Sequence, residues 1–232
     1  MEQLWISTEI KLGTGKGKVV NMRKIQVVTD YELYKYEELD SKGKEKAKRK
    51  YLDEQNEYEF TDMVEADTTL VFPNSKLKVQ YSLSYCQGDG LSVYGKLAFE
   101  DIFNILKGNS YPTLVEGIEP FTEKEIKTLR FYASEEGTLN VDINRRYPFF
   151  CDWCYNFADD WIDTFEGGGL SSIKTDLIYR FEKTVKTIMQ RYCKEWEKEG
   201  YQFFYEIDDE SMEEISEANG WEYLADGTLY VA

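Results

Sequence analysis

Residues 82–95 read SLSYCQGDGLSVYG, two runs of β-forming residues on either side of an Asp-Gly pair. From Val79 to Cys86 apolar and polar residues alternate and aromatic residues are frequent, a pattern that favours a half-buried strand. Asp89-Gly90 can adopt the positive φ angles of a two-residue type I′ turn, and the alternation resumes after it. This segment therefore predicts a β-hairpin, and it contains no known catalytic constellation.

The composition is that of a globular protein. The chain has 232 residues, of which 42% are hydrophobic and 16% aromatic, enough for a packed core. No apolar run approaches the length of a membrane span, and the N-terminus lacks the charged and then apolar segments of an export signal. The four cysteines, Cys86, Cys151, Cys154 and Cys193, do not form a disulfide framework, which suits a reducing compartment. We expect a cytoplasmic protein without membrane contact.

The order of β-like and helix-like segments predicts one continuous α+β domain over residues 1–232, without repeats or long linkers. We expect an antiparallel sheet of hairpins packed against several helices, one of them long and in the C-terminal half. Residues 1–30 contain a hairpin that would be an N-terminal extension. The other expected strands are 32–36, 69–72, 76–86, 91–97, 127–134, 138–144 and 201–207, and residues 108–120 are expected to be a loop. The expected helices are 41–56, 99–106, 152–163, 172–199 with Gly200 ending it, and a short acidic helix capped by Asp208, before a final turn at Asp226-Gly227. In the helix expected over 172–199, apolar residues recur at spacings of three and four, which predicts a core-facing stripe of Ile173, Leu177, Phe181, Val185, Ile188, Tyr192 and Trp196.

Several kinds of catalytic chemistry have no support in the sequence. The chain has no histidine, which removes the commonest general base and metal ligand. Cys151 and Cys154 have C-x-x-C spacing, but a structural zinc site needs four ligands, so we interpret the pair as two small apolar residues at the start of a helix. The glycine- and lysine-rich residues 13–18 are not a phosphate-binding loop, because Val19 follows Lys18. We therefore expect no metal, cofactor or catalytic residue.

Charge is distributed unevenly along the chain. Residues 1–60 carry 12 Lys/Arg and 12 Asp/Glu, so the net charge of −16 comes from residues 61–232. The densest acidic segment runs from Glu199 to Asp226, with ten acidic residues and no basic one. Such a surface repels nucleic acid, and by the same Coulomb argument it attracts a protein built to hold nucleic acid. A purely solvating role for these carboxylates is the alternative.

Three stretches carry a resemblance to a known group of proteins. They are residues 36–47, the S-x-x-Q-G-D-G turn at Ser84–Gly90, and the closing residues 218–230, ANGWEYLADGTLY. In this order they resemble a family of phage-encoded proteins commonly labelled hypothetical or antitoxin of a toxin-antitoxin stability system. The resemblance implies phage origin, expression in the cytoplasm of the bacterial host and an accessory function, and it carries no catalytic residues. The chain departs from the family at Gly43, where alanine is usual.

The favoured function is that of a phage-encoded inhibitor of a bacterial defence system, an anti-CRISPR protein that binds an effector nuclease and blocks nucleic-acid binding. Its partner-binding residues would be the carboxylates of the acidic segment, which mimic the charge of DNA, and an exposed aromatic anchor. The residues assigned to this contact are Asp208, Asp209, Glu210, Glu213, Glu214 and Tyr205.

Two other functions stay open. The first is an antitoxin-like or regulatory protein that binds another host protein through an apolar interface. The second is a metal-dependent enzyme acting on nucleic acid or nucleotides, since a Mg²⁺ site built from Asp89 and nearby carboxylates needs no histidine. Gln87 and Asp89 have two interpretations. Either they form a tight turn that the hairpin requires, or they contact a partner at the tip of the loop.

Overall fold

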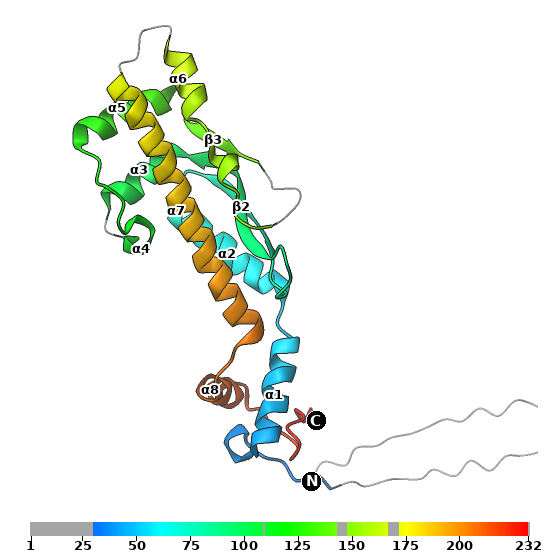
Figure 1. Cartoon of the computed structure of the whole chain (residues 1–232). Helices are drawn as coiled ribbons and strands as arrows, with labels where there is room; N and C mark the ends of the chain where they lie inside the picture. Colours follow the sequence, from blue (N-terminus) through cyan, green and yellow to red (C-terminus); the bar gives the residue numbers. More distant parts are fainter. Residues whose placement is uncertain (1–29, 109, 143–147, 167–171, 232) are drawn as a thin grey trace, which may run out of the picture. The chain divides into compact units, whose positions relative to one another are not determined.

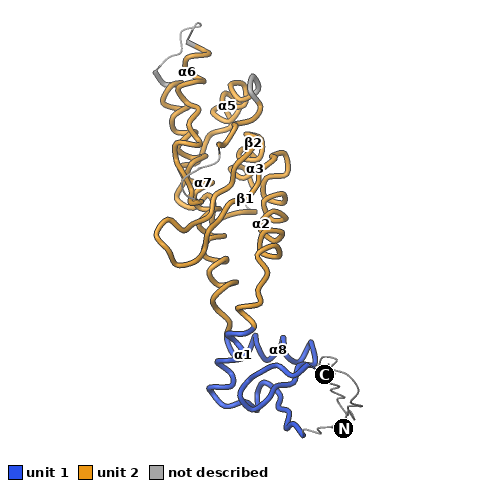
Figure 2. Tube along the Cα trace, turned by 90° about the vertical axis from the view of Figure 1, so that its right-hand side faces the viewer, with its two compact units in different colours: residues 1–50, 208–232 blue, residues 51–207 orange. Residues whose placement is uncertain are grey.

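The computed structural model describes residues 30–108, 110–142, 148–166 and 172–231, so the hairpin expected in residues 1–30 lies outside the described residues. It is an α+β structure with eight α-helices and a three-stranded antiparallel sheet among those residues, as the sequence predicts (Figure 1). Two compact units are present, unit 1 from residues 1–50 and 208–232 and unit 2 from residues 51–207 (Figure 2). The expectation of one continuous domain stays a prediction.

Unit 2 holds the sheet and most of the helices. Its elements are α2 (Glu57–Val71), β1 (Lys76–Ser82), β2 (Gly90–Ala98), α3 (Phe99–Lys107), α4 (Pro112–Val115), α5 (Glu123–Glu136), β3 (Thr138–Val141), the 3₁₀ helix η2 (Asp152–Tyr155), α6 (Ala158–Glu166) and α7 (Ser172–Tyr205). Unit 1 contains the 3₁₀ helix η1 (Tyr36–Glu38), the greater part of α1 (Ser41–Asp53) and α8 (Asp209–Asn219).

The predicted hairpin is confirmed, with a longer connection than expected. Strand β1 pairs antiparallel with β2, and β2 pairs antiparallel with β3, so β2 is the central strand. Ser82 is opposite Gly90, which leaves residues 83–89 as the loop. The two-residue turn predicted at Asp89-Gly90 is wrong: the chain turns at Gln87-Gly88, and the Asp89 N–H donates to the Cys86 carbonyl at 3.2 Å.

The core of unit 2 forms between α7 and the elements that contact it, β2, α2, α4, α5, α6 and η2. Phe181, Val185, Ile188 and Tyr192 belong to the stripe predicted for this helix, and all four are buried. Burial of each side chain contributes roughly 1.5–3 kcal/mol before the loss of conformational entropy is counted. The periodicity of three and four residues therefore identified the core-facing side of α7 correctly.

Three segments expected to be strands are helical. Residues 69–71 complete α2 and Phe72 is its C-cap; Thr68 and Thr69 donate their hydroxyls to carbonyls one turn earlier. Residues 127–134 lie in α5, whose N-terminus has a capping box formed by Thr122 and Glu125. Because this segment is helical, β3 pairs with β2 and not with residues 127–134. Most of residues 201–207 continue α7. In each case β-branched and aromatic residues belong to a helix that tertiary packing stabilises.

Other boundaries differ by smaller amounts. The helix expected over 41–56 ends at Asp53, because Asn56 caps a new helix by accepting the Tyr58 N–H at 2.9 Å. The strand expected over 32–36 is a single bridge between Tyr34 and Tyr223. The helix expected over 152–163 is η2 followed by α6, and the loop expected over 108–120 contains α4.

Contacts between α1 and the C-terminal segment hold unit 1 together. The predicted turn at Asp226-Gly227 is present, and Lys46 donates to the Asp226 carboxylate at 2.6 Å. Gly227 has a φ of +81°, and a Cβ there would collide with the backbone of Gly43. At Gly43 itself an added Cβ would lie 3.2 Å from the Ala225 carbonyl oxygen, a tight contact that explains why glycine suits this chain.

Gly200 lies inside α7, so the prediction that it ends the helix is wrong. A Cβ at this position would overlap the side chain of Leu83 and lie 2.7 Å from Cζ of Phe60. Both neighbours are buried, Phe60 on α2 and Leu83 at the start of the β1–β2 loop. Glycine is therefore required here by close packing, at the cost of about 1 kcal/mol in helix propensity relative to alanine.

We predict that Gly200→Ala destabilises the protein although it improves the helix propensity of α7. Overpacking of a buried contact costs roughly 1–3 kcal/mol, which exceeds the propensity gain. Denaturant unfolding followed by circular dichroism should show a lower midpoint. The control is Glu199→Ala, an exposed position on the same turn, which should be neutral or slightly stabilising. A higher midpoint for Gly200→Ala would contradict the packing argument.

Candidate protein-interaction site

The β1–β2 loop is organised by the carboxylate of Asp89. Its Oδ2 accepts the N–H groups of Cys86 and Ser84, each at 2.7 Å, and the Tyr201 hydroxyl at 3.2 Å. Its Oδ1 accepts the Ser82 hydroxyl at 3.0 Å. The hydrogen bond from the Cys86 N–H is the largest cause that lowers the pKa of Asp89. Three donors converge on Oδ2 and one on Oδ1, so the carboxylate of Asp89 holds the conformation of the loop.

Three tyrosines, which we call the tyrosine cluster, pack together beside this loop: Tyr85, Tyr201 and Tyr205. The Tyr85 ring centroid lies 4.6 Å from that of Tyr201 and 4.8 Å from that of Tyr205. The Tyr205 hydroxyl donates to the Leu83 carbonyl at 2.6 Å. The last turns of α7 therefore hold the loop through one hydrogen bond to its backbone and one to Asp89.

Tyr85 has an unusual backbone conformation. Its φ is +56°, in the left-handed region that bulky residues seldom adopt, and it is the one described residue other than glycine with a positive φ. Its side chain is 66% exposed. Such outliers persist where the surroundings impose them, here the hydrogen bonds to Asp89 on both sides of Tyr85, and they are frequent at binding sites.

The hydroxyl groups of Tyr201 and Tyr205 are neutral at physiological pH. Burial and the nearby Asp89 carboxylate raise the pKa of Tyr201 to about 12, with a further contribution from Glu197. Burial and Asp89 also raise the pKa of Tyr205. Both tyrosines therefore keep the protons that they donate to the loop.

The acidic helix α8 begins with two carboxylates that act within unit 1. Asp208 is the N-cap and accepts the Ser211 N–H at 2.7 Å, which lowers the pKa of Asp208. Asp209 lies 2.8 Å from Lys48 Nζ and accepts the Tyr36 hydroxyl at 3.0 Å, and the bond from Lys48 is the largest cause that lowers its pKa. These two predicted contact residues thus have structural roles of their own.

Four further carboxylates form what we call the glutamate face of α8: Glu210, Glu213, Glu214 and Glu217. Their spacing of i, i+3, i+4 and i+7 places them on one side of the helix, whereas Met212 and Ser216 are buried. Within the described part of the chain none of the four carboxylates forms an ion pair. Like charges at these spacings repel each other by a few tenths of a kcal/mol per pair, so the face destabilises its own helix.

The residues predicted for partner binding fall into two groups. Gln87 and Asp89 lie in the β1–β2 loop, and Tyr205 donates its hydroxyl to the Leu83 carbonyl of the same loop. These residues all belong to unit 2, and Gln87 is exposed. The five carboxylates from Asp208 to Glu214 belong to unit 1. Sequence reasoning missed Glu217, which the spacing of Glu210, Glu213 and Glu214 could have revealed. It also missed Tyr85 and Tyr201, for which no local pattern exists.

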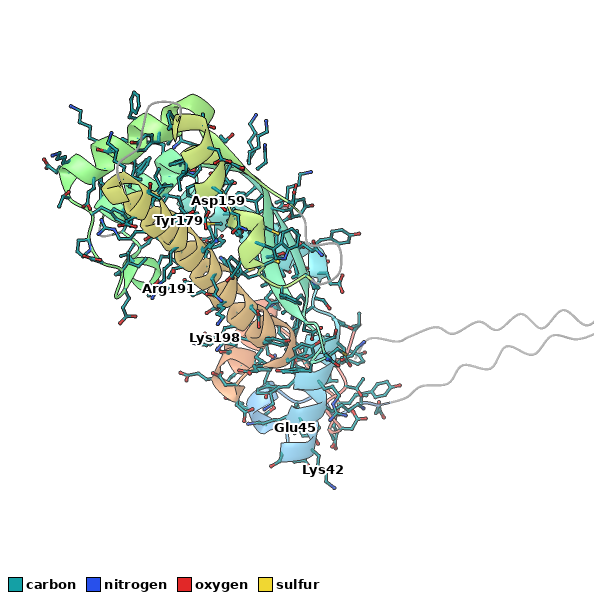
Figure 3. The ribbon with its side chains drawn as sticks, turned by 45° about the horizontal axis from the view of Figure 1, so that its top comes forward. Lys42, Glu45, Asp159, Tyr179, Arg191 and Lys198 are labelled. Carbon is teal, nitrogen blue, oxygen red and sulfur yellow. The ribbon has the colours of Figure 1, made fainter. Side chains whose placement is uncertain are left out.

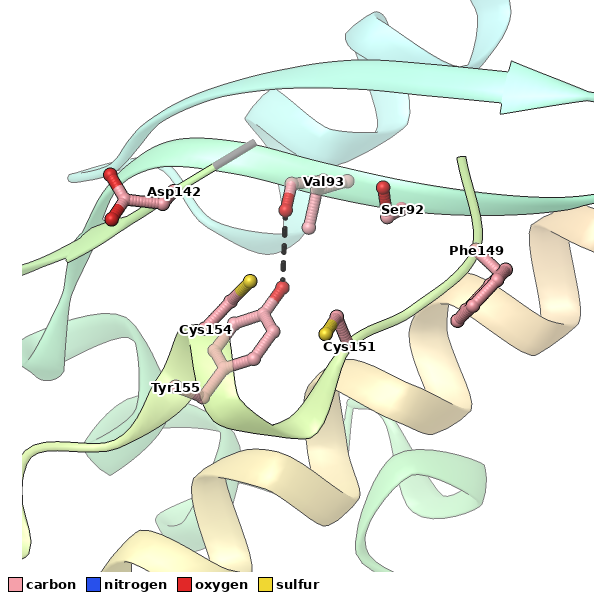
Figure 4. Close-up of a pocket in the computed structure, with 7 residues that line it drawn as sticks. All are labelled: Ser92, Val93, Asp142, Phe149, Cys151, Cys154 and Tyr155. Atoms are coloured by element: carbon pink, nitrogen blue, oxygen red, sulfur yellow. Dashed lines mark hydrogen bonds between the residues drawn. The ribbon is translucent and has the colours of Figure 1, made fainter. Parts of the chain in front are cut away.

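The cysteine pair lies at a small pocket of unit 2, where Cys154 is buried and Cys151 is half-buried (Figure 4). The pocket is lined by Ser92, Val93, Asp142, Phe149, Cys151, Cys154 and Tyr155. The pocket has room for about one water molecule. Burial raises the pKa of the Cys154 thiol to about 12, with a further contribution from Cys151, so Cys154 is not a reactive thiolate.

A hydrogen bond between two side chains joins α6 and α7 in unit 2. Tyr179 on α7 and Asp159 on α6 lie side by side, and the tyrosine hydroxyl donates to the carboxylate at 2.6 Å (Figure 3).

Within the described ranges no three His, Cys, Asp or Glu side chains are placed so that they could hold a metal ion. No helix among the same residues is both long and apolar enough to span a bilayer.

No protein-family model, curated protein or solved structure matches this chain. The resemblance to the phage-encoded family therefore stays a prediction, and the function is inferred from the geometry of the chain itself.

We predict that the β1–β2 loop loses its order in acid before the core does. Because the folded-state pKa of Asp89 is lowered, its contribution is complete above the ordinary value of about 3.9 and disappears as the pH falls through the lowered pKa. Hydrogen exchange, corrected for the intrinsic effect of pH, should show the Ser84 and Cys86 amides protected at neutral pH and exposed in acid. The Val185 amide in the core of α7 is the internal control.

Asp89→Ala should leave the Ser84 and Cys86 amides poorly protected at every pH, because no side-chain oxygen remains to accept their hydrogens. Unchanged protection of these amides in the variant would contradict the assigned role of Asp89.

Proposed function

We propose that this protein is a phage-encoded inhibitor of a bacterial defence system. It binds a CRISPR effector nuclease through the glutamate face of α8 and prevents nucleic acid from reaching the nuclease. Three features support this proposal: the resemblance of three sequence stretches to a phage family, the net charge of −16, and the unpaired carboxylates of α8.

The observation that carries the proposal is the glutamate face itself. α8 has five acidic residues and no basic one among its eleven positions. Negative charge near the start of a helix is stabilised by the helix dipole, but Glu213, Glu214 and Glu217 lie beyond the first turn. The helix therefore keeps a surface that repels itself, and a cationic partner would relieve this repulsion.

The channel of a nucleic-acid-binding nuclease is such a partner, because it is lined with Lys and Arg that pair with phosphates. Carboxylates spaced along one helix face would occupy those side chains in place of the phosphate backbone. The net negative charge would also speed the encounter with a positively charged channel, and it opposes any direct binding of DNA by this protein.

We predict that reversing three charges of the glutamate face strongly weakens inhibition. The test measures DNA cleavage by a panel of purified, guide-loaded CRISPR effector nucleases with the wild type and with the E210K/E213K/E214K variant. We expect at least about a tenfold loss of inhibition, because each contact to a basic side chain becomes a repulsion. Lysine and glutamate have similar helix propensity, so α8 should be retained.

The matched control is D62K/E65K/D163K, which reverses three exposed carboxylates on α2 and α6. It makes the same change in net charge and should retain inhibition. Equal losses in both variants would mean that only net charge matters, and full inhibition by the α8 variant would exclude the glutamate face.

Salt dependence gives an independent test. Inhibition by charge should weaken steeply as ionic strength rises, because screening acts on exposed ions. Binding of a bacterial protein that is insensitive to salt would support the antitoxin-like alternative instead. If no effector in the panel is inhibited, the proposed function is wrong.

A further inference from the structure

The tyrosine cluster is an exposed aromatic surface that the proposed role of α8 does not use. It belongs to unit 2, whereas the glutamate face belongs to unit 1. The ring of Tyr85 stacks on Tyr201, with an interplanar angle of 30°, and lies tilted against Tyr205, yet two thirds of its side chain stays in contact with solvent. An aromatic ring held in this way is already ordered, so a ligand that stacks on it loses little additional conformational entropy.

The conformation of the β1–β2 loop keeps the Tyr85 ring exposed. Asp89 fixes the backbone immediately before and after Tyr85 through the N–H groups of Ser84 and Cys86. The left-handed φ of Tyr85 is a strained conformation for a residue with a Cβ. Because a tyrosine that served only the turn could be replaced by glycine without this strain, the ring at this position indicates a contact.

Charge decides which ligand the cluster fits. The Asp89 carboxylate contacts Tyr201, and Glu197 also acts electrostatically on the Tyr201 hydroxyl. From Glu199 to Ile207, where unit 2 ends, the sequence contains no basic residue, and Lys198 is the last one before this segment. The faces of the rings are themselves negative, and negative neighbours strengthen their attraction for a cation.

We propose that the tyrosine cluster is a docking surface for arginine side chains of a partner protein, with the guanidinium stacked on the exposed face of Tyr85. Arginine fits better than lysine because its planar guanidinium is weakly hydrated, stacks on aromatic rings and directs donors to surrounding acceptors. Stacking of a nucleic-acid base is the competing possibility, but the phosphate attached to the base would be repelled by Asp89 and by the net charge of the protein.

The first experiment is a titration with the peptide Gly-Arg-Gly-Arg-Gly, followed through the tyrosine ring signals in nuclear magnetic resonance spectra. We expect saturable shifts of the Tyr85, Tyr201 and Tyr205 signals. A peptide with citrulline in place of arginine, which has the same shape without the charge, should bind at least about fivefold more weakly. Equal binding of the two peptides would overturn the proposal, and so would the absence of shifts at the cluster.

The second experiment uses variants of Tyr85. Tyr85→Gly removes the ring and accepts the positive φ, so the loop should keep its conformation and lose the peptide-induced shifts. Tyr85→Phe keeps the ring and should bind about as well as the wild type. The matched control is Tyr58→Ala, which removes an 80% exposed tyrosine from α2 and should leave the shifts unchanged. Retention of the shifts in Tyr85→Gly would contradict the assigned contact.

A short oligothymidylate is the decisive competitor. If it moves the same ring signals more strongly than the arginine peptide does, the cluster is a base-stacking surface and the proposal is wrong. Because these readouts involve no nuclease and no residue of α8, their outcome is independent of the proposed function.

Discussion

Burial of one face of α7 is the interaction on which unit 2 depends. Phe181, Val185, Ile188 and Tyr192 are withdrawn from water along this face, and β2 together with four of the other helices of the unit contacts the same helix. The outer strands are attached through β2, which pairs with both of them. Because α7 continues past Gly200, the helix that forms the core also presents Tyr201 and Tyr205 to the β1–β2 loop. Core packing and the candidate arginine surface therefore share one rigid element.

Sequence reasoning succeeded where a pattern is local and long. The alternation around residues 76–97 predicted the hairpin, and the apolar period of three and four residues predicted α7. It failed at residues 69–72, 127–134 and 201–207, where β-branched and aromatic residues lie in helices that neighbouring elements stabilise. It also failed at Gly200, because a glycine needed for contact with Phe60 and Leu83 has the same appearance in a sequence as one that ends a helix.

The two candidate surfaces also differ in how far the sequence predicts them. The carboxylates of α8 could be found from charge density alone, although the structure assigns Asp208 to the helix cap and Asp209 to an ion pair with Lys48. What remains for a partner is the face that begins with Glu210 and includes Glu217. The tyrosine cluster could not be predicted, because Tyr85 and Tyr201 come from distant parts of the chain and meet only when α7 packs beside the hairpin. Asp89 was singled out for its place in a turn, and its carboxylate links the loop to α7.

The cysteines have a practical consequence for the study of this protein. Cys154 and Cys193 are buried, burial raises the pKa of each thiol to about 12, and Cys151 is half-buried. Cys86 is the one exposed thiol of the four, and it lies in the loop next to Tyr85. An alkylating dye added to the folded protein should therefore attach first beside the tyrosine cluster, where it would report the arrival of a partner. Slow modification of Cys193 would then record how often the core of unit 2 opens.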